Sequence, residues 1–462
     1  MTPLAGTAVL TAEQMRAAEA AVMAAGTDVH ELMARAGAGV AAAVERLAAG
    51  AEVLVLCGPG NNGGDGYVAA ARLREAGLPV RVAAFGTPAT EAASRARAGW
   101  GGPVEAIGDA EPAPVLVDAV FGTGLSRPLD EDLVARLHVL RDRADLAVAV
   151  DLPSGVSTND GVLLSDIPAF DLTLALGAAK PAHLLQPAAA RMGSVRVIDI
   201  GVRVAGEVTV IDRPRWPAPG PEDHKYSRGL VTVVSGPMHG ASELAALSAY
   251  RAGAGYVLLL TGGLPQRPHA IVRKGWSADA LADERIGAAV VGPGLGRDDR
   301  ARAKLDAALA TRHPLVIDGD ALHLLDPAQL RGRAAPSVLT PHAGEFANLF
   351  GKSESEGSKL DRARAAARHS GAVVVFKGPD TVIAAPDGSA VIAAGGSPWL
   401  SVAGTGDVLA GAIGAMLARG LSPAEAAAAG VWLHGEAARL LDRCFLADEL
   451  ADALPAALRQ CR

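Results

Sequence analysis

The stretch VLVLCGPGNNGGDG, residues 53–66, contains a short apolar run that leads into a glycine-rich turn. A continuous run such as VLVLC is typical of a strand buried on both faces of a sheet. The glycines let the chain turn sharply, and a helical pattern follows over Asp65–Ala76. The turn is neither the GxGxxG of a dinucleotide fold nor a P-loop, because it lacks the P-loop lysine.

The same alternation continues along the chain. Further apolar runs in the first half are VRVAAF (80–85), VLVDAV (115–120) and LAVAVDL (146–152), with a helical pattern over Glu131–Arg143. The second half has YVLLL (256–260), GAAVVG (287–292), PLVID (314–318), SVLT (337–340) and VVVF (373–376). Short apolar strands separated by helices predict an α/β fold with parallel sheets covered on both faces.

A proline-rich segment interrupts this alternation. DRPRWPAPGPEDHKYSRG, residues 212–229, concentrates prolines and charges, and proline removes backbone donors and favours an extended path. A chain of 462 residues is also long for one core and suits two domains. We predict a first domain at 1–213, a linker at 214–228 and a second domain at 229–462.

Composition excludes several classes of protein. Hydrophobic residues make up 50% of the chain and aromatic residues 3%, so small aliphatic side chains must build the core. The net charge is −7 and no run of Lys and Arg stands out, which argues against nucleic-acid binding. No signal peptide and no apolar run of membrane-spanning length is visible. Cys57, Cys444 and Cys461 match no metal spacing and read as free thiols, so we expect a cytoplasmic protein.

Three strand ends of the first half carry polar motifs. GPGNNGGDG (58–66), VDAVFGTGLSRP (117–128) and VDLPSGV (150–156) each follow a predicted strand, and ligands of open α/β sheets bind beyond such ends. These motifs present Asn62, Asp118, Asp151 and Ser154 to one crevice. Hard oxygens without Cys or His suit an alkali or alkaline-earth ion. A single Asn or Asp in a turn usually only shapes that turn, whereas three such loops in series favour a site.

The motif AGTGDVLAG, residues 403–411, places Asp407 at the predicted start of a buried helix. Glycine-rich backbone and a helix N-terminus attract phosphate, but a carboxylate repels it. Asp407 makes chemical sense if it takes a proton from a hydroxyl that meets a phosphoryl group. The alternative is that it merely caps the helix.

Three other motifs of the second half carry candidate site residues. Lys377 in VVVFKGPDTVI (373–383) is a point charge suited to phosphate, or a surface lysine. His342 in TPHAGE (340–345) either faces a ligand or is a loop histidine whose ring is already hydrogen-bonded within the protein. Asp318 and Asp320 in VIDGDAL line the phosphate site or cap the next helix.

Together these motifs resemble a known family. GPGNNGGDG, DAVFGTG and DLPSGV, with LTAEQMRAAE (10–19) and ELMARAG (31–37), resemble the NAD(P)H-hydrate epimerase domain. TPHAGE, FKGPDTVI and AGTGDVLAG, with HGASELAALSAYRAGAGYV (239–257) and VVGPGLG (290–296), are similar to the ADP-dependent NAD(P)H-hydrate dehydratase. Both in this order resemble the bifunctional NAD(P)H-hydrate repair enzymes. The resemblance implies two three-layer αβα domains, Rossmann-like first and ribokinase-like second.

The resemblance also implies activities. Water adds to the dihydronicotinamide ring of NADH or NADPH and gives a hydrate with two epimers. The first domain would interconvert the R and S epimers, and the second would restore NAD(P)H from the S epimer while consuming ADP. Asp151 and Asp407 would be catalytic. Expected partners are small molecules only, with neither nucleic acid nor membrane, and we expect a homo-oligomer.

Binding residues follow from the motifs in the same way. The resemblance assigns the hydrate, in the first domain, to Asn61, Asn62, Gly63, Gly64, Asp65, Gly122, Thr123, Gly124, Leu125, Ser126, Arg127, Pro128 and Asp151. In the second domain it assigns the hydrate to Ala241, Gly294, His342 and Asp407, and the nucleotide phosphates to Lys377, Gly378, Pro379, Asp380, Thr381 and Gly406. A potassium ion would be held by Asn62, Asp118 and Ser154, and Mg²⁺ would accompany ADP.

The sequence departs from the family pattern just before GTGD. Val402 stands where a threonine is frequent, and Ser397 where an asparagine is frequent, so one hydrogen bond to a ligand is in doubt. Two other functions stay open at this point. Vitamin kinases of ribokinase-like fold use the same aspartate with ATP, but they lack the fused GPGNNGGDG domain. The first half would otherwise be a nucleotide sensor or scaffold, against which the four polar residues of the crevice argue.

Overall fold

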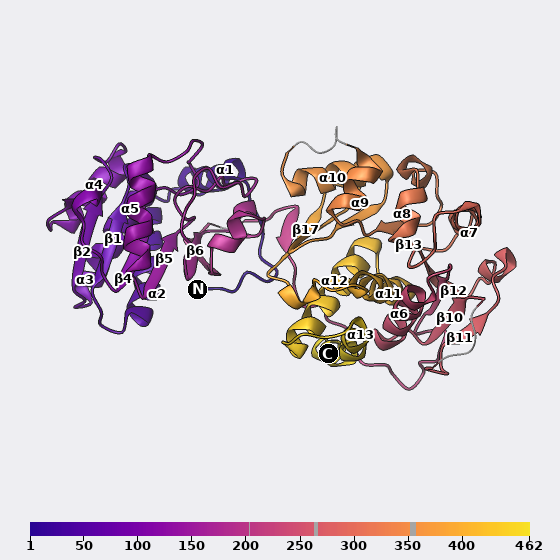
Figure 1. Ribbon diagram of the computed structural model, residues 1–462. Coiled ribbons are helices and arrows are strands. Elements are labelled where there is room, and N and C mark those ends of the chain that lie inside the picture. Colours follow the sequence, from indigo (N-terminus) through magenta and orange to yellow (C-terminus); the bar gives the residue numbers. More distant parts are fainter. Residues whose placement is uncertain (203, 263–266, 352–356) are drawn as a thin grey trace. The chain divides into compact units, whose positions relative to one another are not determined.

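The computed structural model describes residues 1–202, 204–262, 267–351 and 357–462. Two compact units form, Met1–Val210 and Ile211–Arg462 (Figure 1). The predicted linker, 214–228, is included in the second unit, where the Trp216 N–H donates to the carbonyl of Cys461 at 3.0 Å. Within the described ranges, no helix is long and apolar enough to cross a membrane.

The first unit is built on a seven-stranded parallel sheet in the order β3-β2-β1-β4-β5-β6-β7. Its strands are β1 (Val53–Cys57), β2 (Val80–Ala84), β3 (Glu105–Ala106), β4 (Val115–Ala119), β5 (Leu146–Val150), β6 (Leu172–Leu176) and β7 (Ser194–Ile198). A short strand, β8 (Val208–Val210), lies beside the N-terminal segment, where the Val9 N–H donates to the Val208 carbonyl. The strand order reverses between β1 and β4, and such a reversal opens a crevice at the carboxyl ends.

Helices cover both faces of this sheet. They are α1 (Ala12–Ala24), α2 (Val29–Ala48), α3 (Asn61–Glu75), α4 (Glu91–Trp100) and α5 (Glu131–Asp142), with 3₁₀ turns η1 (Ile107–Asp109), η2 (Pro181–His183) and η3 (Ala188–Arg191). Val40 and Val44 of α2 belong to the core on one face, and Leu133 and Leu137 of α5 to the core on the other. The helix predicted to begin at Asp65 begins earlier, at Asn61, so the glycine motif forms the first helical turn.

The second unit contains a larger, mixed sheet. Its strands are β9 (Leu230–Val234), β10 (Tyr256–Leu260), β11 (Val272–Lys274), β12 (Ile286–Val291), β13 (Leu315–Ile317), β14 (Ser337–Leu339), β15 (Val373–Phe376), β16 (Asp380–Ala384) and β17 (Ala390–Ala394). They run in the order β11-β10-β9-β12-β13-β14-β15-β16-β17. The strands β15, β16 and β17 pair antiparallel, and the others pair parallel. A second reversal of strand order lies between β9 and β12.

The helices of this unit again form two layers. They are α6 (His239–Arg251), α7 (Asp299–Leu309), α8 (Asp320–Leu324), α9 (Ala343–Phe350), α10 (Lys359–Ser370), α11 (Thr405–Ala418), α12 (Pro423–Leu441) and α13 (Ala447–Gln460), with η4 (Ala278–Leu281), η5 (Pro327–Leu330) and η6 (Pro398–Leu400). α6, α11, α12 and α13 share one core cluster with the sheet. On the opposite face, Phe346 of α9 stacks on Phe376 of β15 with ring centroids 4.1 Å apart.

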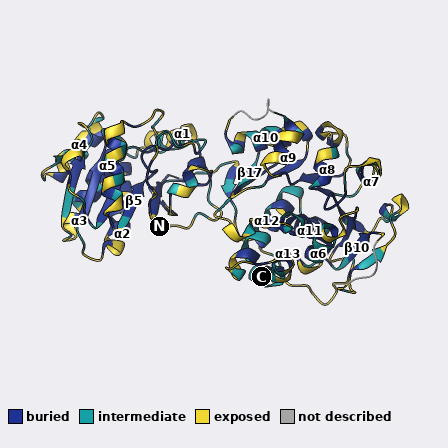
Figure 2. Cartoon of the chain, viewed as in Figure 1, coloured by how far each residue is buried: buried dark blue, intermediate teal, exposed yellow. Residues whose placement is uncertain are grey.

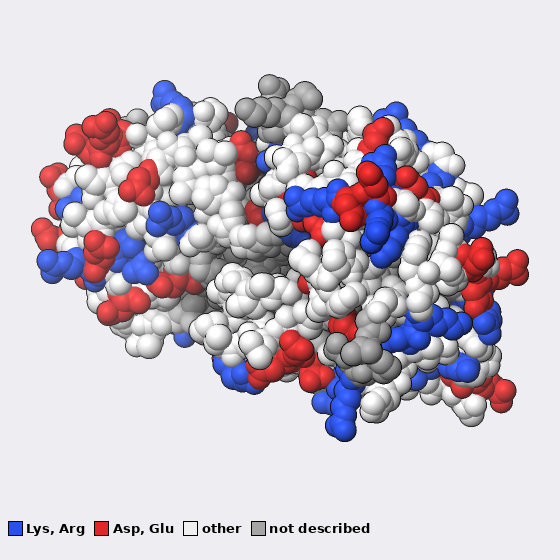
Figure 3. Space-filling model, turned by 45° about the vertical axis from the view of Figure 1, so that its right-hand side comes forward, with Lys and Arg blue, Asp and Glu red and all other residues white. Residues whose placement is uncertain are grey.

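Burial follows this layering. Figure 2 shows the strands mostly buried and most outer helices with exposed residues, whereas α11 is buried at every position from Val408 to Leu417. Figure 3 shows Lys and Arg interspersed with Asp and Glu on the face it displays, as the modest net charge of −7 suggests. The predicted α/β class with three-layer units is therefore confirmed, and the antiparallel hairpin β16–β17 is among the features that were not predicted.

Candidate active sites

A cavity of about 540 Å³ opens at the carboxyl ends of β1, β4 and β5. Helices α1 and α2 supply an apolar wall that includes Met15, Met23 and Met33. Its polar lining consists of Arg16, Glu19, Asn61, Asn62, Asp65, Thr90, Thr123, Asp151 and Lys180. A cavity with an apolar wall and a few convergent polar groups is the usual form of a small-molecule site.

Most of the residues predicted to bind the hydrate meet at this cavity. Asn61, Asn62, Asp65, Gly122, Thr123, Gly124, Leu125 and Asp151 line it. Gly63 and Gly64 are instead buried in the first turn of α3, where a Cβ on Gly63 would lie 1.9 Å from the carbonyl oxygen of Gly58. Ser126, Arg127 and Pro128 follow on the same loop and are not among the residues described as lining the cavity. The two glycines therefore shape the cavity, and the loop beyond Leu125 leaves it.

Asp151 is held in one orientation. Its backbone has φ 64°, an uncommon conformation for a residue with a side chain, which active sites often retain. One carboxylate oxygen accepts from the ammonium of Lys180 at 2.5 Å and from the Leu176 N–H, and the other accepts from the hydroxyl of Thr123 at 3.0 Å. Burial raises the pKa of Asp151, but Lys180 and these hydrogen bonds more than offset that effect and lower it below the usual value.

Lys180 and His183 are functional candidates that the sequence reasoning missed. Lys180 is 1% exposed and also donates to the Leu176 carbonyl at 2.7 Å. His183 Nδ1 accepts from the Lys180 N–H, so its Nε2 carries the proton and donates to the Asp151 carbonyl at 2.6 Å. Burial, together with Lys180, lowers the pKa of His183 to about 4, so the ring is neutral. One signal was available, because GAAKPAH follows an apolar strand as the other site motifs do.

The residues predicted to hold potassium lie partly beneath the cavity. Asp118 is fully buried, and its carboxylate accepts from the N–H and hydroxyl of Ser154 and from the Val120 N–H. Burial raises the pKa of Asp118. Among the described residues, Asp118 has no Lys, Arg or His at ion-pair distance, and the Asn62 amide nitrogen is buried without a hydrogen bond. The Ser154 hydroxyl and the Asp118 carboxylate bond each other directly, and carboxylate, hydroxyl and amide oxygens are ligands that suit a monovalent cation.

In the second unit, Asp407 lies in the first turn of α11. The helix begins at Thr405, two residues before the predicted start, and its N-cap is Gly404 with φ 91° and no side-chain cap. Asp407 is therefore not the capping residue that the alternative interpretation required. Burial, followed by repulsion from Asp318, raises the pKa of Asp407 to about 7, although Lys377 acts in the opposite direction. A carboxylate with a pKa near neutrality suits a general base.

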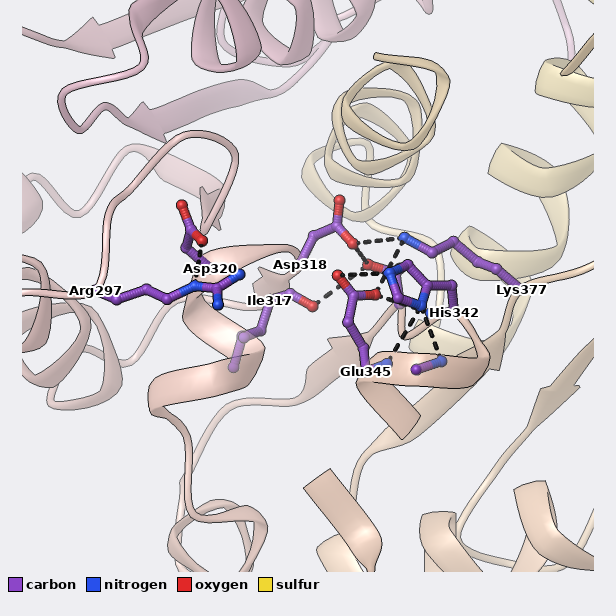
Figure 4. A network of polar contacts seen from close by, with 9 residues as sticks. Arg297, Ile317, Asp318, Asp320, His342, Glu345 and Lys377 are labelled. Atoms are coloured by element: carbon purple, nitrogen blue, oxygen red, sulfur yellow. Dashed lines mark hydrogen bonds and ion pairs between the residues drawn. The ribbon is translucent and has the colours of Figure 1, made fainter. Parts of the chain in front are cut away.

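Lys377 follows β15 and lies among carboxylates from two other elements, Asp318 after β13 and Glu345 in the first turn of α9. Its ammonium lies 2.8 Å from Asp318 and 3.8 Å from Glu345, and these three side chains point toward one another in Figure 4. Burial lowers the pKa of Lys377, but the two carboxylates raise it to a net value above the usual one. A Cβ on Gly406 would lie 3.4 Å from this ammonium, so the start of α11 closely approaches it. Lys377 is 19% exposed, which rules out the interpretation as an ordinary surface lysine.

The other predicted nucleotide residues form the turn between β15 and β16. Gly378 and Thr381 bond each other across this turn, because the Thr381 hydroxyl donates to the Gly378 carbonyl at 2.8 Å. Pro379 lies between them, and Asp380 pairs with Lys359 at 2.5 Å. The carboxylate of Asp380 is thus already bonded, and the Gly378 N–H donates to the Thr381 hydroxyl at 3.2 Å.

The predicted hydrate residues of the second unit are placed less uniformly. His342 is the N-cap of α9, where its Nδ1 accepts from the N–H groups of Gly344 and Glu345. The Nδ1 atom of His342 is therefore already hydrogen-bonded within the protein, and its Nε2 atom lies 3.6 Å from Glu345. Gly294, with φ 63°, accepts from the Met238 N–H just before α6, whose first turn carries Ala241.

Asp318 and Asp320 have different roles. Asp318 accepts from Lys377 and from the Thr340 hydroxyl at 2.7 Å through one carboxylate oxygen. Asp320 opens α8 and instead accepts from the Gly296 N–H and from Arg297 at 2.8 Å, away from Lys377 in Figure 4. Asp318 therefore belongs to the Asp407 site, and Asp320 fixes the neighbouring loop.

Comparison with known proteins agrees with this geometry. The family model described as NAD(P)H-hydrate dehydratase matches residues 231–458, and the one described as YjeF-related protein N-terminus matches residues 29–182. The bifunctional NAD(P)H-hydrate repair enzyme of Mycobacterium tuberculosis is 37% identical over 440 residues, which cover 90% of each chain. The enzyme of that name from Escherichia coli is 36% identical over 452 residues, covering 91% of this chain and 87% of the relative.

The chain belongs to the family of bifunctional NAD(P)H-hydrate repair enzymes. Among solved structures, it is similar to a crystal structure of the ADP/ATP-dependent NAD(P)H-hydrate dehydratase of Bacillus subtilis, co-crystallised with ATP and Mg²⁺. That match has 31% identity and a TM-score of 0.49, and it covers 54% of this chain and 95% of the other. The family is one of repair enzymes over most of the chain's length, which removes the support for a vitamin kinase.

Proposed function

We propose that this protein repairs hydrated NADH and NADPH, with epimerisation in Met1–Val210 and ADP-dependent dehydration in Ile211–Arg462. The observation that carries the proposal is Asp407 with a pKa of about 7 beside the buried cation Lys377, at the N-terminus of α11. This arrangement joins a proton acceptor to a phosphate-binding terminus. Membership of the repair family in both halves supports the pairing of the two activities.

Dehydration is hard because hydroxide is a poor leaving group. In the proposed step, the hydroxyl of the S hydrate gives its proton to the carboxylate of Asp407 while its oxygen attacks the terminal phosphoryl group of ADP. AMP leaves, and the hydroxyl becomes a phosphate ester. Inorganic phosphate then leaves as the neighbouring carbon loses a proton, which restores the ring double bond. Lys377 balances the negative charge that gathers at the phosphoryl group.

The nucleotide site is proposed at the ends of β13, β14 and β15. Lys377 would contact the phosphates together with the backbone of the 378–381 turn and of Gly406. Mg²⁺ would come bound to ADP and neutralise its phosphates, and Asp318 has one carboxylate oxygen that accepts no hydrogen bond in the described part of the chain. Magnesium sites of this kind use one or two carboxylates and substrate phosphates.

The epimerase site is proposed in the cavity around Asp151. The apolar wall of methionines accommodates a flat ring, because methionine side chains adapt their shape. Asp151 stays ionised and fixed, so it can accept a proton from the hydrate. Potassium bound by Asn62, Asp118 and Ser154 would supply a positive charge that holds the β4 and β5 loops in place.

We further propose a cytoplasmic location, which the three free cysteines support. A homo-oligomeric state remains a prediction.

A spectroscopic assay tests the proposal. Purified protein is incubated with a mixture of R and S NADPH hydrates, with ADP, with ATP or with no nucleotide. The near-ultraviolet absorbance of the restored dihydronicotinamide is then followed. The expected result is recovery with ADP and no recovery without nucleotide. Absence of recovery with any nucleotide would reject dehydration as the function of the second unit.

A further inference from the structure

The cavity of the first unit contains more carboxyl groups than cations can balance. Glu19 of α1, Asp65 of α3 and Asp151 all line it. Its buried cation, Lys180, is already bonded to Asp151 and to the Leu176 carbonyl. The other lining cation, Arg16, pairs with Glu13 in an exposed salt bridge.

Asp65 is the more deeply buried of two carboxyl groups that line the cavity without a partner among the described residues; the other is Glu19, which is half-buried and whose pKa is also raised, mainly by burial. Asp65 is 8% exposed, and in the described part of the chain its side chain makes neither an ion pair nor a hydrogen bond. No other ionisable group approaches from α2, which contributes Val29, Leu32, Met33 and Ala36 to the cavity, or from the start of α4, which contributes Thr90. The charged groups around Asp65 are thus Glu19 and Arg16 from α1, Asp151 after β5 and Lys180 after β6.

A buried carboxyl group among other carboxylates binds its proton more tightly than an exposed one does. Burial raises the pKa of Asp65 well above its usual value, and Asp151 and Glu19 add to this effect, while Lys180 opposes it. Asp151 shows the opposite behaviour, because its pKa is lowered. When the pKa values of neighbouring carboxyl groups are shifted in opposite directions in this way, the neutral group can donate a proton and the charged group can accept one.

We propose that Asp65 is the proton donor and Asp151 the proton acceptor of the epimerisation, which rests on the proposed function of the first unit. Both residues line one cavity, from α3 on one side and from the end of β5 on the other. Gly122 lies between their loops, because a Cβ there would be 2.9 Å from Asn62 of the α3 motif and 3.2 Å from the Asp151 carboxylate. A substrate seated over Gly122 therefore reaches both sides.

The chemistry of the hydrate needs such a pair. Water adds to an enamine so that the hydroxyl stands on the carbon bonded to the ring nitrogen. In the proposed step, the hydroxyl proton moves to Asp151, the oxygen forms a carbonyl, and the carbon–nitrogen bond breaks. Its electron pair goes to the nitrogen, which takes the proton of Asp65. After rotation of the open chain, the nitrogen attacks the other face of the carbonyl, returns its proton to Asp65, and the oxygen recovers a proton from Asp151.

The variant Asp65→Asn tests this role. An amide has nearly the shape of a carboxylic acid but no proton that it can transfer. Conversion of the purified R hydrate into the S hydrate is measured by chromatography without ADP, so that dehydration is silent. We expect a loss of about 10²-fold or more, as is typical for a positioned acid. Equilibrium dialysis should show a Kd for the hydrate within about threefold of the native value, because the amide keeps nearly the shape of the carboxyl group. A tenfold change in Kd would correspond to about 1.4 kcal/mol.

A matched control lies on the same helix. Glu75→Gln removes an exposed carboxylate that pairs with Arg72 at 3.0 Å, and it should leave epimerisation unchanged. Near-native epimerisation by Asp65→Asn would overturn the proposal. So would a loss of activity matched by an equal loss of binding, which would make Asp65 a binding residue only.

The native protein gives a second readout if Asp65→Asn does not fold. Its epimerisation rate should fall as the pH rises and Asp65 loses its proton, and a rate that never falls with rising pH would overturn the proposal. A native protein that does not epimerise the hydrate at any pH would instead reject the proposed function itself. The two failures are therefore distinguishable.

Discussion

At the scale of single residues, Asp407 should make stability depend on pH. Its pKa is about 7 in the folded protein, against 3.8 as the unperturbed value, and burial is the main cause. The folded state therefore binds this proton more tightly than the unfolded state does. The stabilisation is fully present below pH about 4 and is lost as the pH rises through about 7.

The variant Asp407→Asn measures this effect without reference to catalysis. At pH 3 the aspartate of the native protein is protonated in both the folded and the unfolded state and resembles asparagine, so the two proteins should melt together. At pH 8 the native aspartate is ionised beside Asp318, and the variant should melt a few °C higher, since each kcal/mol shifts the midpoint by roughly 2–4 °C for a unit of this size. Differential scanning calorimetry at both pH values checks it. A variant that is equally stable at both would contradict the buried, perturbed carboxylate.

Lys180 should be more important to the folded state than its position in the sequence suggests. It is 1% exposed, and its ammonium is bonded to Asp151 at 2.5 Å. Removing one partner of a buried ion pair costs roughly 3–5 kcal/mol, because the other charge is left without a partner. We therefore expect Lys180→Met to lower the thermal midpoint of the first unit strongly.

The double variant Asp151→Asn, Lys180→Met provides the control for that prediction. It removes both charges, so it should recover most of the lost stability. Thermal unfolding of the two variants gives the coupling directly. A double variant as unstable as Lys180→Met alone would show that the pair is not the cause.

At the scale of the elements, two helix-interior glycines should respond to the same substitution with opposite signs. A Cβ on Gly411 of α11 would lie 2.1 Å from the backbone oxygen of Ala245 in α6, so Gly411→Ala must separate these helices. Gly435 of α12 has open space around the corresponding position. Alanine is better than glycine in a helix by about 0.8–1.0 kcal/mol, so Gly435→Ala should be stabilising.

Both substitutions can be compared in one experiment. Urea unfolding should show a lower midpoint for Gly411→Ala and a higher one for Gly435→Ala. Because Asp407 is one turn before Gly411 on the same helix, Gly411→Ala should also slow dehydration. Equal responses of the two variants would contradict the close packing of α11 on α6.

The elements also show how far the sequence predicts the structure. The strands 53–57, 256–260 and 373–376 match their predicted bounds. A short continuous apolar run strongly favours a strand buried on both faces of a sheet. The helices α3 and α11 begin before their predicted starts, since glycines in their first turns hide the helical pattern. The hairpin β16–β17 was missed because nothing in its local pattern distinguishes an antiparallel pair.

The sequence singles out Asp151, Asp118 and Lys377 as candidates because their motifs stand at strand ends, and Asp407 because its motif opens a buried helix. Lys180 and His183 were missed because their importance comes from contacts with Asp151 that span 29 and 32 residues. Such pairing is set by the order of strands β5 and β6, which a local pattern does not show.

At the scale of the whole molecule, the two activities should be separable. Asp118→Asn removes the buried charge beneath the first cavity, and we expect it to abolish the dependence of epimerisation on KCl while dehydration of the S hydrate stays unchanged. Rates are measured with KCl exchanged for choline chloride at constant ionic strength. Anomalous density of rubidium near Asp118 and Asn62 in a soaked crystal would locate the ion. A variant with the native response to potassium would reject this metal site.

The most direct test of the central claim begins from the purified R hydrate of NADPH, because its repair needs both activities in sequence. With ADP, the native protein should restore NADPH from all of it. Asp407→Asn should convert R into S but restore NADPH at least about 10²-fold more slowly, which is the usual contribution of a positioned base. We therefore expect the S hydrate to accumulate in this variant, which chromatography measures. Restoration of NADPH by Asp407→Asn at the native rate, or by the native protein without a nucleotide, would contradict the central claim.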